Sequence, residues 1–262
     1  MLKRFPLLKK ILRKVRDRVS LKGSISSNYV NLQQSEMNSE GQRLRNSWQD
    51  EGLPIKQREL VDQQLIKFRK GVNIDVFDVF VKSLKDLPLL HSSKSLLEIG
   101  CSSGFYSEVL EIAHLDLEYS GCDYSESFIS LARRKYPSLD FSVEDATSLS
   151  YSDASFDIVV SGCCLLHIPQ YVKAIEQTAR VAKSYAIFHR TPVVWGKEEQ
   201  WYRKLAYGVE TVEIHFNEIQ FLNLLELNGL DLIATYTLNE EFLSSDRSIG
   251  YANRTYVCRK KD

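Results

Sequence analysis

A glycine-containing turn with an acid just before it is the part of this sequence best suited to bind a ligand. Residues 95–110 read SLLEIGCSSGFYSEVL, so that an apolar stretch containing Glu98 is followed by Gly100, Gly104 and a helical pattern. Glycine adopts positive φ and lacks a side chain, so a turn built from it can approach a ligand closely. The dinucleotide-binding pattern G-x-G-x-x-G is absent, because Ser102 stands where its second glycine would be. The stretch therefore predicts a nucleotide-like ligand other than a dinucleotide.

Two further acids end later strand-like stretches. Asp123, in YSGCDYS and followed by Tyr124, can accept hydrogen bonds from both hydroxyls of a ribose. Asp145, in SVEDATSL and followed by Ala146, can accept a hydrogen bond from an exocyclic amine such as that of adenine. Each acid by itself could equally be a helix cap or a turn residue, since Asp is favoured in both. Their order after the glycine turn points to a nucleoside.

Two histidines and an arginine follow the next strand-like stretches. His167 ends the segment SFDIVVSGCCLLHIP before its final Ile-Pro, and His189 and Arg190 lie in IFHRTP. Either histidine could be the general base for a nucleophile that keeps its proton, and Arg190 could hold an anionic group of a substrate. Alternatively, His167 positions its loop and His189 is a structural residue whose hydrogen bonds are satisfied. No spacing of His, Asp and Glu suggests a metal site.

Alternating strand and helix patterns must position these residues. The strands expected in the central region lie near residues 95–99, 118–123, 140–144, 156–163 and 184–190. The helices expected between them lie near residues 104–114, 125–136 and 169–182. Alternation with short connections predicts a parallel sheet with helices on both faces.

The last third of the chain shows a different pattern. Helical patterns near residues 198–207 and 216–228 precede strands near 230–238 and 254–259, and no helix separates these two strands. Strands joined without a crossover helix must pair antiparallel. The sequence therefore predicts an α/β fold with a Rossmann-like, seven-stranded, mostly parallel sheet and a C-terminal antiparallel hairpin.

The N-terminal segment is basic and amphipathic. Residues 1–22 hold nine of the 34 Lys and Arg residues and one of the 34 acids. On a helical wheel one stripe contains the apolar residues Phe5, Leu8, Ile11, Leu12, Val15 and Val19. This pattern is typical of a helix that lies in a membrane interface with its bases toward anionic headgroups. The alternative is a solvated helix that packs on the domain. We expect contact with an anionic membrane surface through residues 1–20.

A polar stretch and two helical patterns separate this segment from the first strand. Residues 20–53 are rich in Ser, Asn, Gln and Gly and predict a linker or a loosely held cap, in which Tyr29 and Trp48 could cover a substrate or dock on the domain surface. Helices are expected near residues 54–70 and 74–90. The resulting division of the chain is a basic amphipathic helix at 1–22, a linker and helical cap at 23–92, and the main domain at 93–262.

Charge and cysteine content restrict the class of protein. The chain beyond residue 22 carries a net charge of −8, which argues against extended nucleic-acid binding. Five cysteines without a C-x-x-C pair indicate reduced thiols in a cytoplasmic protein. No apolar stretch reaches the roughly 18 residues of a transmembrane helix, and the N-terminus lacks the pattern of a secretory signal. We expect a cytoplasmic protein, peripheral on the inner face of the plasma membrane.

The ordered set of motifs resembles the class I S-adenosylmethionine-dependent methyltransferases over about residues 93–260. Glu98-x-Gly100-Cys101-x-x-Gly104 is similar to their first motif, Asp123 to their ribose-binding acid and Asp145-Ala146 to their adenine-contacting pair. SFDIVVSGCCLLHIP resembles their fourth strand and the loop after it. The resemblance implies S-adenosylmethionine as cofactor. It implies cofactor contacts at Glu98, Gly100, Cys101, Gly104, Asp123, Tyr124, Asp145, Ala146 and Ser161.

The same resemblance implies transfer of a methyl group, with two candidate acceptors and one alternative without catalysis. The phrases FHRTPV and VETVEIHFNEIQFLNLLE are similar to methyltransferases of bacterial surface-polysaccharide biosynthesis, which implies O-methylation of a saccharide or a lipid-linked glycan precursor. The alternatives are a small molecule of the lipid or quinone type, and a module that binds S-adenosylmethionine without catalysis. On this interpretation His167 or His189 is the catalytic base, and Arg190, Tyr29 and Trp48 contact the substrate. The sequence does not indicate an oligomeric state.

Overall fold

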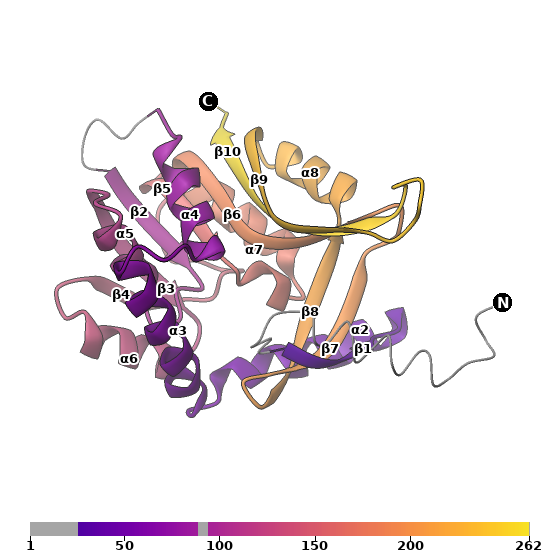
Figure 1. Ribbon diagram of the computed structural model, residues 1–262, viewed down its shortest axis with the longest axis horizontal. Coiled ribbons are helices and arrows are strands. Elements are labelled where there is room, and N and C mark those ends of the chain that lie inside the picture. The colour runs from indigo at the N-terminus through magenta and orange to yellow at the C-terminus, as the bar shows by residue number, and fades with distance from the viewer. Residues whose placement is uncertain (1–25, 89–93, 262) are drawn as a thin grey trace.

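The structure is a computed structural model that describes residues 26–88 and 94–261 (Figure 1). The basic segment 1–22, expected to form an amphipathic helix, lies outside the described residues. In the described part, a twisted sheet with helices on both faces forms the body of the molecule, and an antiparallel ribbon extends from one end of that sheet (Figure 1). None of the helices described is both long enough and apolar enough to cross a membrane.

Five parallel strands form one half of the sheet, in the spatial order β4-β3-β2-β5-β6. The strands are β2 (Lys94–Ile99), β3 (Leu117–Asp123), β4 (Asp140–Val143), β5 (Phe156–Gly162) and β6 (Ala182–Trp195). The prediction of this parallel half is confirmed. Strands covered on both faces need apolar residues in sequence, and the consecutive residues Leu96 and Leu97 are accordingly both buried, in cores on opposite faces.

Helices cover both faces of these strands. One core includes residues of α3 (Leu53–Arg69), α4 (Asp75–Lys85), α5 (Tyr106–Ile112) and α6 (Glu126–Lys135). The other includes residues of α7 (Tyr171–Val181) and α8 (Glu218–Leu227), with the short helix η3 (Leu165–His167) after β5. Helices therefore form in all six of these predicted regions, although α4 ends five residues before the predicted boundary at residue 90.

The C-terminal hairpin completes the predicted seven strands. It consists of β9 (Leu230–Phe242) and β10 (Gly250–Lys260), which pair antiparallel. Strand β10 also pairs antiparallel with β6, so it lies between β6 and β9. The predicted α/β fold with a mostly parallel sheet and a closing antiparallel hairpin is confirmed.

The predicted helix at residues 198–207 is wrong. Strand β7 (Gln200–Ala206) forms there and pairs antiparallel with β8 (Val209–Asn217). The sheet of the described residues therefore has ten strands, three more than the seven predicted. The two-residue connection Tyr207-Gly208 has φ values of +51° and +89°. Positive φ at both central residues matches a type I′ hairpin turn, which follows the twist of the two strands.

The segment before α3 packs as a cap on this ribbon, and it is not a linker. Strand β1 (Ser26–Asn31) pairs antiparallel with β7. Helix α2 (Gln34–Asn46) and the short helix η2 (Ser47–Gln49) follow, and both contact β8 (Figure 1). The start of α2 is stabilised by a capping box, in which the Gln33 amide donates to the Glu36 carboxylate at 2.8 Å.

Candidate active site

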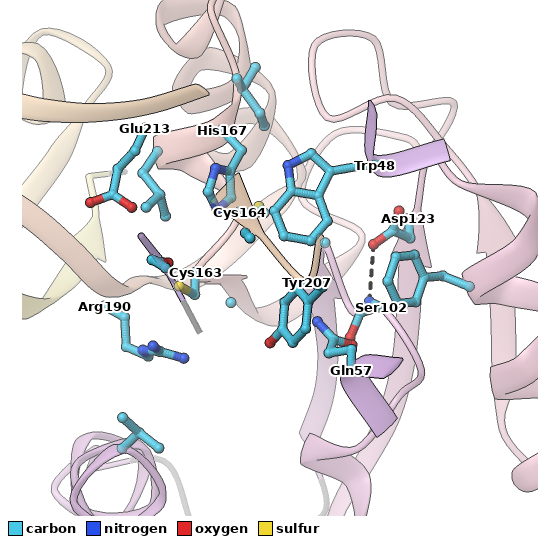
Figure 2. A pocket seen from close by; sticks show the side chains of 18 of the residues that line it. Trp48, Gln57, Ser102, Asp123, Cys163, Cys164, His167, Arg190, Tyr207 and Glu213 are labelled. Atoms are coloured by element: carbon cyan, nitrogen blue, oxygen red, sulfur yellow. Dashed lines mark hydrogen bonds between the residues drawn. The ribbon is translucent and has the colours of Figure 1, made fainter. Parts of the chain in front are cut away.

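A cavity of about 360 Å³ lies at the carboxyl ends of the parallel strands and is closed on another side by the β1-β7-β8 ribbon (Figure 2). Open α/β sheets bind ligands at this edge. The predicted site residues that line the cavity are Tyr29, Trp48, Gly100, Asp123, Tyr124, Ala146, His167 and Arg190. One cavity therefore joins the glycine turn to residues expected on the acceptor side.

The glycine turn requires glycine at position 100. Gly100 has φ of +73°, and a Cβ added there would lie 2.3 Å from the Cβ of Cys164. The backbone amides of Gly100 and Cys101 donate to the carbonyl of Cys122 at 2.8 and 3.0 Å, which ties the turn to β3. Ser102 also has positive φ, of +48°, so a non-glycine residue adopts the left-handed conformation at the middle of this turn.

Asp123 connects the turn to the next loop and faces the cavity. Its carboxylate accepts hydrogen bonds from the amides of Ser102 and Ser125, both at 3.0 Å (Figure 2). Burial raises the pKa of Asp123 to about 6, against the lowering effect of these amide donors. A carboxylate has about four acceptor positions, so Asp123 can accept further hydrogen bonds from a ligand.

An arginine that the sequence did not single out lies beside the predicted adenine contacts. Arg45 of α2 forms an ion pair with Asp145 at 2.8 Å, and its guanidinium lies 4.9 Å from the centre of the Tyr124 ring. The Tyr124 hydroxyl donates to the Arg45 carbonyl. The Asp145 carboxylate also accepts from Thr147, and of the predicted pair Ala146 lines the cavity. The contact of Asp145 with a ligand stays a prediction.

Glu98 does not line the cavity either. It is 1% exposed, and its carboxyl group accepts a hydrogen bond from the Tyr119 hydroxyl at 2.5 Å. Burial raises the pKa of Glu98 to about 8. The group is thus a buried carboxylic acid under the turn, packed so tightly against β5 that a Cβ on Gly162 would lie 2.5 Å from its Oε1. Its position supports the turn from below, and its predicted contact with the cofactor stays a prediction.

Three other predicted cofactor contacts also point into the core. Cys101 is fully buried, with its sulfur against Gly121. Gly104 faces the Phe141 ring, which would lie 2.6 Å from an added Cβ. Ser161 is 3% exposed, and its hydroxyl lies 3.3 Å from the Cys164 sulfur. These residues shape the turn and the end of β5, while the neighbouring residues Ser102, Gly162, Cys163 and Cys164 line the cavity.

The two predicted bases have different environments. His189 is 1% exposed and lies in the core, with Nδ1 2.8 Å from the Thr255 hydroxyl and Nε2 3.0 Å from the Tyr106 hydroxyl. Both ring nitrogens of His189 therefore have protein partners, and its role as a base stays a prediction. His167 lines the cavity and lies 2.5 Å through Nδ1 from the carbonyl of Val212.

The contacts of His167 define its chemical form. Since a carbonyl can only accept, Nδ1 carries the proton and Nε2 is the acceptor nitrogen. Burial lowers the pKa of His167 to about 3, so the ring is neutral at physiological pH. Trp48 from η2 stacks at a tilt on this ring, with 4.7 Å between the ring centres (Figure 2).

The ribbon contributes a buried ion pair, of which Lys204 was missed because residues 198–207 were expected to be helical. Lys204 of β7 and Glu213 of β8 both line the cavity and pair with each other. Glu213 also accepts from His215 at 2.8 Å and from the Tyr29 hydroxyl at 3.4 Å. Two signals could have identified this hairpin from the sequence. One is the alternation of apolar and polar residues in β8, and the other is the Tyr207-Gly208 turn.

Several polar atoms of the cavity wall are buried without a protein partner. Seven such side-chain atoms occur in the described residues, and five of them belong to cavity residues. These five are Arg45 Nε, Trp48 Nε1, Gln57 Oε1, Arg190 Nε and Asn253 Oδ1. Because buried polar groups are normally paired, their concentration here indicates a polar ligand that supplies the missing partners. In residues 26–88 and 94–261, no group of three or more His, Cys, Asp or Glu residues is arranged to hold a metal ion.

Comparison with known proteins places a methyltransferase domain over the same region. Residues 97–189 match the family model described as a methyltransferase domain. The demethylmenaquinone methyltransferase of Paenarthrobacter aurescens is 31% identical over 90 residues, 34% of this chain and 35% of that protein. The phthiotriol/phenolphthiotriol dimycocerosates methyltransferase of Mycobacterium leprae is 29% identical over 94 residues, 34% of this chain and 35% of that protein. The chain thus spans about a third of the length of these curated relatives.

Solved structures share the fold over a longer part of the chain. A SAM-dependent methyltransferase from Methanosarcina mazei aligns with a TM-score of 0.50 and 22% identity, over 67% of this chain and 98% of that one. A second match is the 1,6-didemethyltoxoflavin-N1-methyltransferase of Burkholderia thailandensis, which was solved with S-adenosylhomocysteine. It aligns with a TM-score of 0.51 and 13% identity, over 80% of this chain and 89% of that one. Residues 97–189 therefore match the model of a methyltransferase domain, and the chain shares its fold with these solved methyltransferases.

Proposed function

We propose that this protein is an S-adenosylmethionine-dependent methyltransferase that O-methylates a saccharide or a lipid-linked glycan precursor. The observation that carries the proposal is the single cavity that joins Asp123 and the Gly100 turn to a wall of aromatic rings and unpartnered polar atoms. The family match over residues 97–189 supports the reaction type.

The cofactor end is formed by the turn and by Asp123. The free acceptor positions of the Asp123 carboxylate suit the two ribose hydroxyls, and the absence of a side chain at Gly100 permits close approach of the backbone. S-adenosylmethionine supplies an activated methyl group on sulfur. The contribution of the protein is then to align the acceptor hydroxyl with that methyl group, an effect worth up to roughly 7–11 kcal/mol in well-oriented systems.

His167 is the residue best placed to handle the proton of the acceptor. Its neutral ring lies in the cavity wall with Nδ1–H directed at the Val212 carbonyl, which leaves Nε2 to accept from an acceptor hydroxyl. The stacked Trp48 ring holds the imidazole in this orientation. We propose His167, rather than the fully buried His189, as the general base on account of its position in the cavity wall. Its pKa of about 3 makes it a weak base unless a bound ligand changes its surroundings.

The part of the cavity that lies away from Asp123, where the methyl acceptor would bind, suits a polyhydroxylated ring. The rings of Tyr29, Trp48, Tyr207 and Tyr251 line it, and aromatic faces pack against the apolar faces of sugars. The unpartnered oxygens of Gln57 and Asn253 are acceptors for hydroxyl groups, and the Trp48 indole N–H is a donor.

A second candidate acceptor is a lipid or quinone-type small molecule, because the curated relatives carry demethylmenaquinone and phthiotriol/phenolphthiotriol dimycocerosates in their names. Transfer of labelled methyl from S-adenosylmethionine to a panel of glycans and quinone precursors separates the two. Cofactor binding without transfer to any member of a broad panel would favour the third interpretation, a non-catalytic module.

Calorimetric titration with S-adenosylhomocysteine tests the cofactor site. We expect micromolar binding to the wild-type protein and at least tenfold weaker binding to Asp123→Asn, because the amide replaces an anionic acceptor for the ribose hydroxyls. A wild-type protein that is folded and does not bind would overturn the proposal. Unfolding midpoints of both proteins control for damage to the two backbone contacts that Asp123 makes.

The same titration across pH checks the role of the carboxylate. Since the pKa of Asp123 is about 6, the acceptor form predominates above pH 6 and is lost as the pH falls below it. Wild-type affinity should therefore be constant above about pH 7 and decrease by up to about tenfold per pH unit below pH 6. Asp123→Asn should lack this dependence, and a wild-type profile as flat as that of the variant would contradict the assignment.

We further propose that residues 1–20 bring the enzyme to an anionic membrane surface, where lipid-linked acceptors would be found. The nine bases in residues 1–22 support this. The full chain should cosediment with phosphatidylglycerol vesicles and not with phosphatidylcholine vesicles. Equal cosedimentation with both would contradict an electrostatic contact.

A further inference from the structure

Arg190 enters the cavity through an irregularity in the sheet. Along the β6–β10 pairing, Phe188 faces Tyr256 and Thr191 faces Arg254, so His189 and Arg190 together face Thr255 alone. Two residues opposite one define a β-bulge, which changes the direction of the side chains that follow it. At this bulge His189 enters the core, whereas the Arg190 side chain points into the cavity (Figure 2).

The conformation of Arg190 is one that side chains rarely adopt. Its φ is +59°, a value at which glycine would be the unstrained residue. Eight non-glycine residues in the described part of the chain have positive φ, and four of them line the cavity: Ser102, Cys163, Arg190 and Tyr207. Backbone strain of this kind collects at ligand sites, where the surrounding fold holds it.

The charge of Arg190 lacks a counterion among the described residues. The two other cationic residues of the cavity wall are neutralised, Lys204 by Glu213 and Arg45 by Asp145. No salt bridge in the described part of the chain involves Arg190, and its Nε is buried without a hydrogen-bond partner. The groups around it are not carboxylates: Cys163, Tyr106 and Tyr207 lie nearest, and Tyr106 forms a side-chain hydrogen bond with the guanidinium. A buried guanidinium that lacks a counterion is stabilised when a ligand brings an anionic group within hydrogen-bonding distance.

We propose that Arg190 binds an oxyanion of the acceptor, so that the acceptor is an acidic saccharide carrying a carboxylate or a phosphate. This inference rests on the proposed methyltransferase function. The planar guanidinium can donate two parallel hydrogen bonds to either group, while the unpartnered oxygen of Asn253 on the adjacent strand β10 accepts from a hydroxyl. A sugar bound through its acidic group would be fixed in orientation relative to His167.

The test is a titration of the protein saturated with S-adenosylhomocysteine, using D-glucuronate, glucose 1-phosphate and neutral D-glucose as probes. We expect at least one anionic probe to bind at least tenfold more tightly than glucose. Arg190→Gln should lose at least tenfold of that affinity, and Arg190→Lys should retain part of it, since it keeps the charge without the paired donors. A matched control is Arg203→Gln on β7, which removes a half-buried arginine that is paired with Glu210 outside the cavity and should not change the affinity for any probe.

The binding of S-adenosylhomocysteine to each variant identifies the source of the oxyanion. We expect unchanged cofactor affinity in Arg190→Gln. A tenfold loss would assign the guanidinium to the methionine carboxylate of the cofactor and overturn the proposal. Equal binding of glucuronate, glucose 1-phosphate and glucose to the wild-type protein, or anion affinity that survives in Arg190→Gln, would also overturn it. Failure of the wild-type protein to bind S-adenosylhomocysteine would refute the proposed function. The anionic probes can also be titrated into the protein without S-adenosylhomocysteine, so the two failures are distinguishable.

Discussion

Replacing Gly100 with alanine should weaken the binding of S-adenosylhomocysteine by roughly 100-fold, while replacing Gly71 with alanine should leave it unchanged. The two glycines have nearly the same backbone conformation, with φ of +73° and +76°. A Cβ at position 100 would lie 2.3 Å from the Cβ of Cys164, whereas nothing lies within 4 Å of one at position 71. The turn or the loop after β5 must therefore move in the first variant only, and a displacement of about 1 Å at a site can cost about 100-fold.

Denaturant unfolding and calorimetry of both variants measure this difference. The shared conformational penalty is about 1–2 kcal/mol, so Gly71→Ala should lose that amount of unfolding free energy. Gly100→Ala should lose more, because it adds the overlap with Cys164. Wild-type affinity in Gly100→Ala would show that the turn does not lie against the ligand.

Replacing Glu213 with glutamine should lower the free energy of unfolding by about 3–5 kcal/mol, because it leaves the Lys204 ammonium buried without its counterion. The side chains of Lys204 and Glu213 are 6% and 8% exposed. Glu210, three residues earlier on β8, is 45% exposed and pairs with Arg43 and Arg203 at the surface. Glu210→Gln removes the same charge and should change the free energy of unfolding by less than about 1 kcal/mol.

The pH dependence of stability provides an independent check. Burial alone would raise the pKa of Glu213, but the charge of Lys204 and the hydrogen bond with His215 hold it far below its usual value of 4.5. An acid with a lower pKa in the folded state stabilises above its unfolded pKa, and this contribution is lost as the pH falls. The stability difference between wild type and Glu213→Gln should therefore be full at pH 7 and shrink below about pH 4.5. A difference that is constant from pH 7 to pH 3 would contradict this origin.

Local sequence patterns were sufficient for the seven-stranded core of the sheet. Apolar runs such as that of β2, separated by helical periods and ended by turn residues, depend on neighbours within a few positions. The locations of Gly100 and Asp123 follow from the same patterns, because each comes at the end of a strand whose carboxyl end must lie at the ligand edge of the sheet. These features could be predicted because the physical cause is local.

The ribbon could not be predicted in this way. Residues 198–207 are rich in helix-forming types, yet they form β7 because β8 on one side and β1 on the other supply hydrogen-bonding partners. Strand β1 is more than 160 residues away in sequence. Pairing with a distant strand overrides the local helix propensity of residues 198–207. This pairing also places Lys204 and Glu213 in the cavity wall.

Side-chain direction at the site was likewise decided by tertiary structure. His189 and Arg190 are adjacent, and only the bulge opposite Thr255 determines that the histidine enters the core while the arginine enters the cavity. Arg45 meets Asp145 because α2 packs on the ribbon, a contact across 100 residues of sequence. The sequence by itself determined the seven strands outside the ribbon and indicated where a nucleoside could bind. The tertiary structure decided which side chains face that ligand, because exposure and pairing depend on groups brought together from distant parts of the chain.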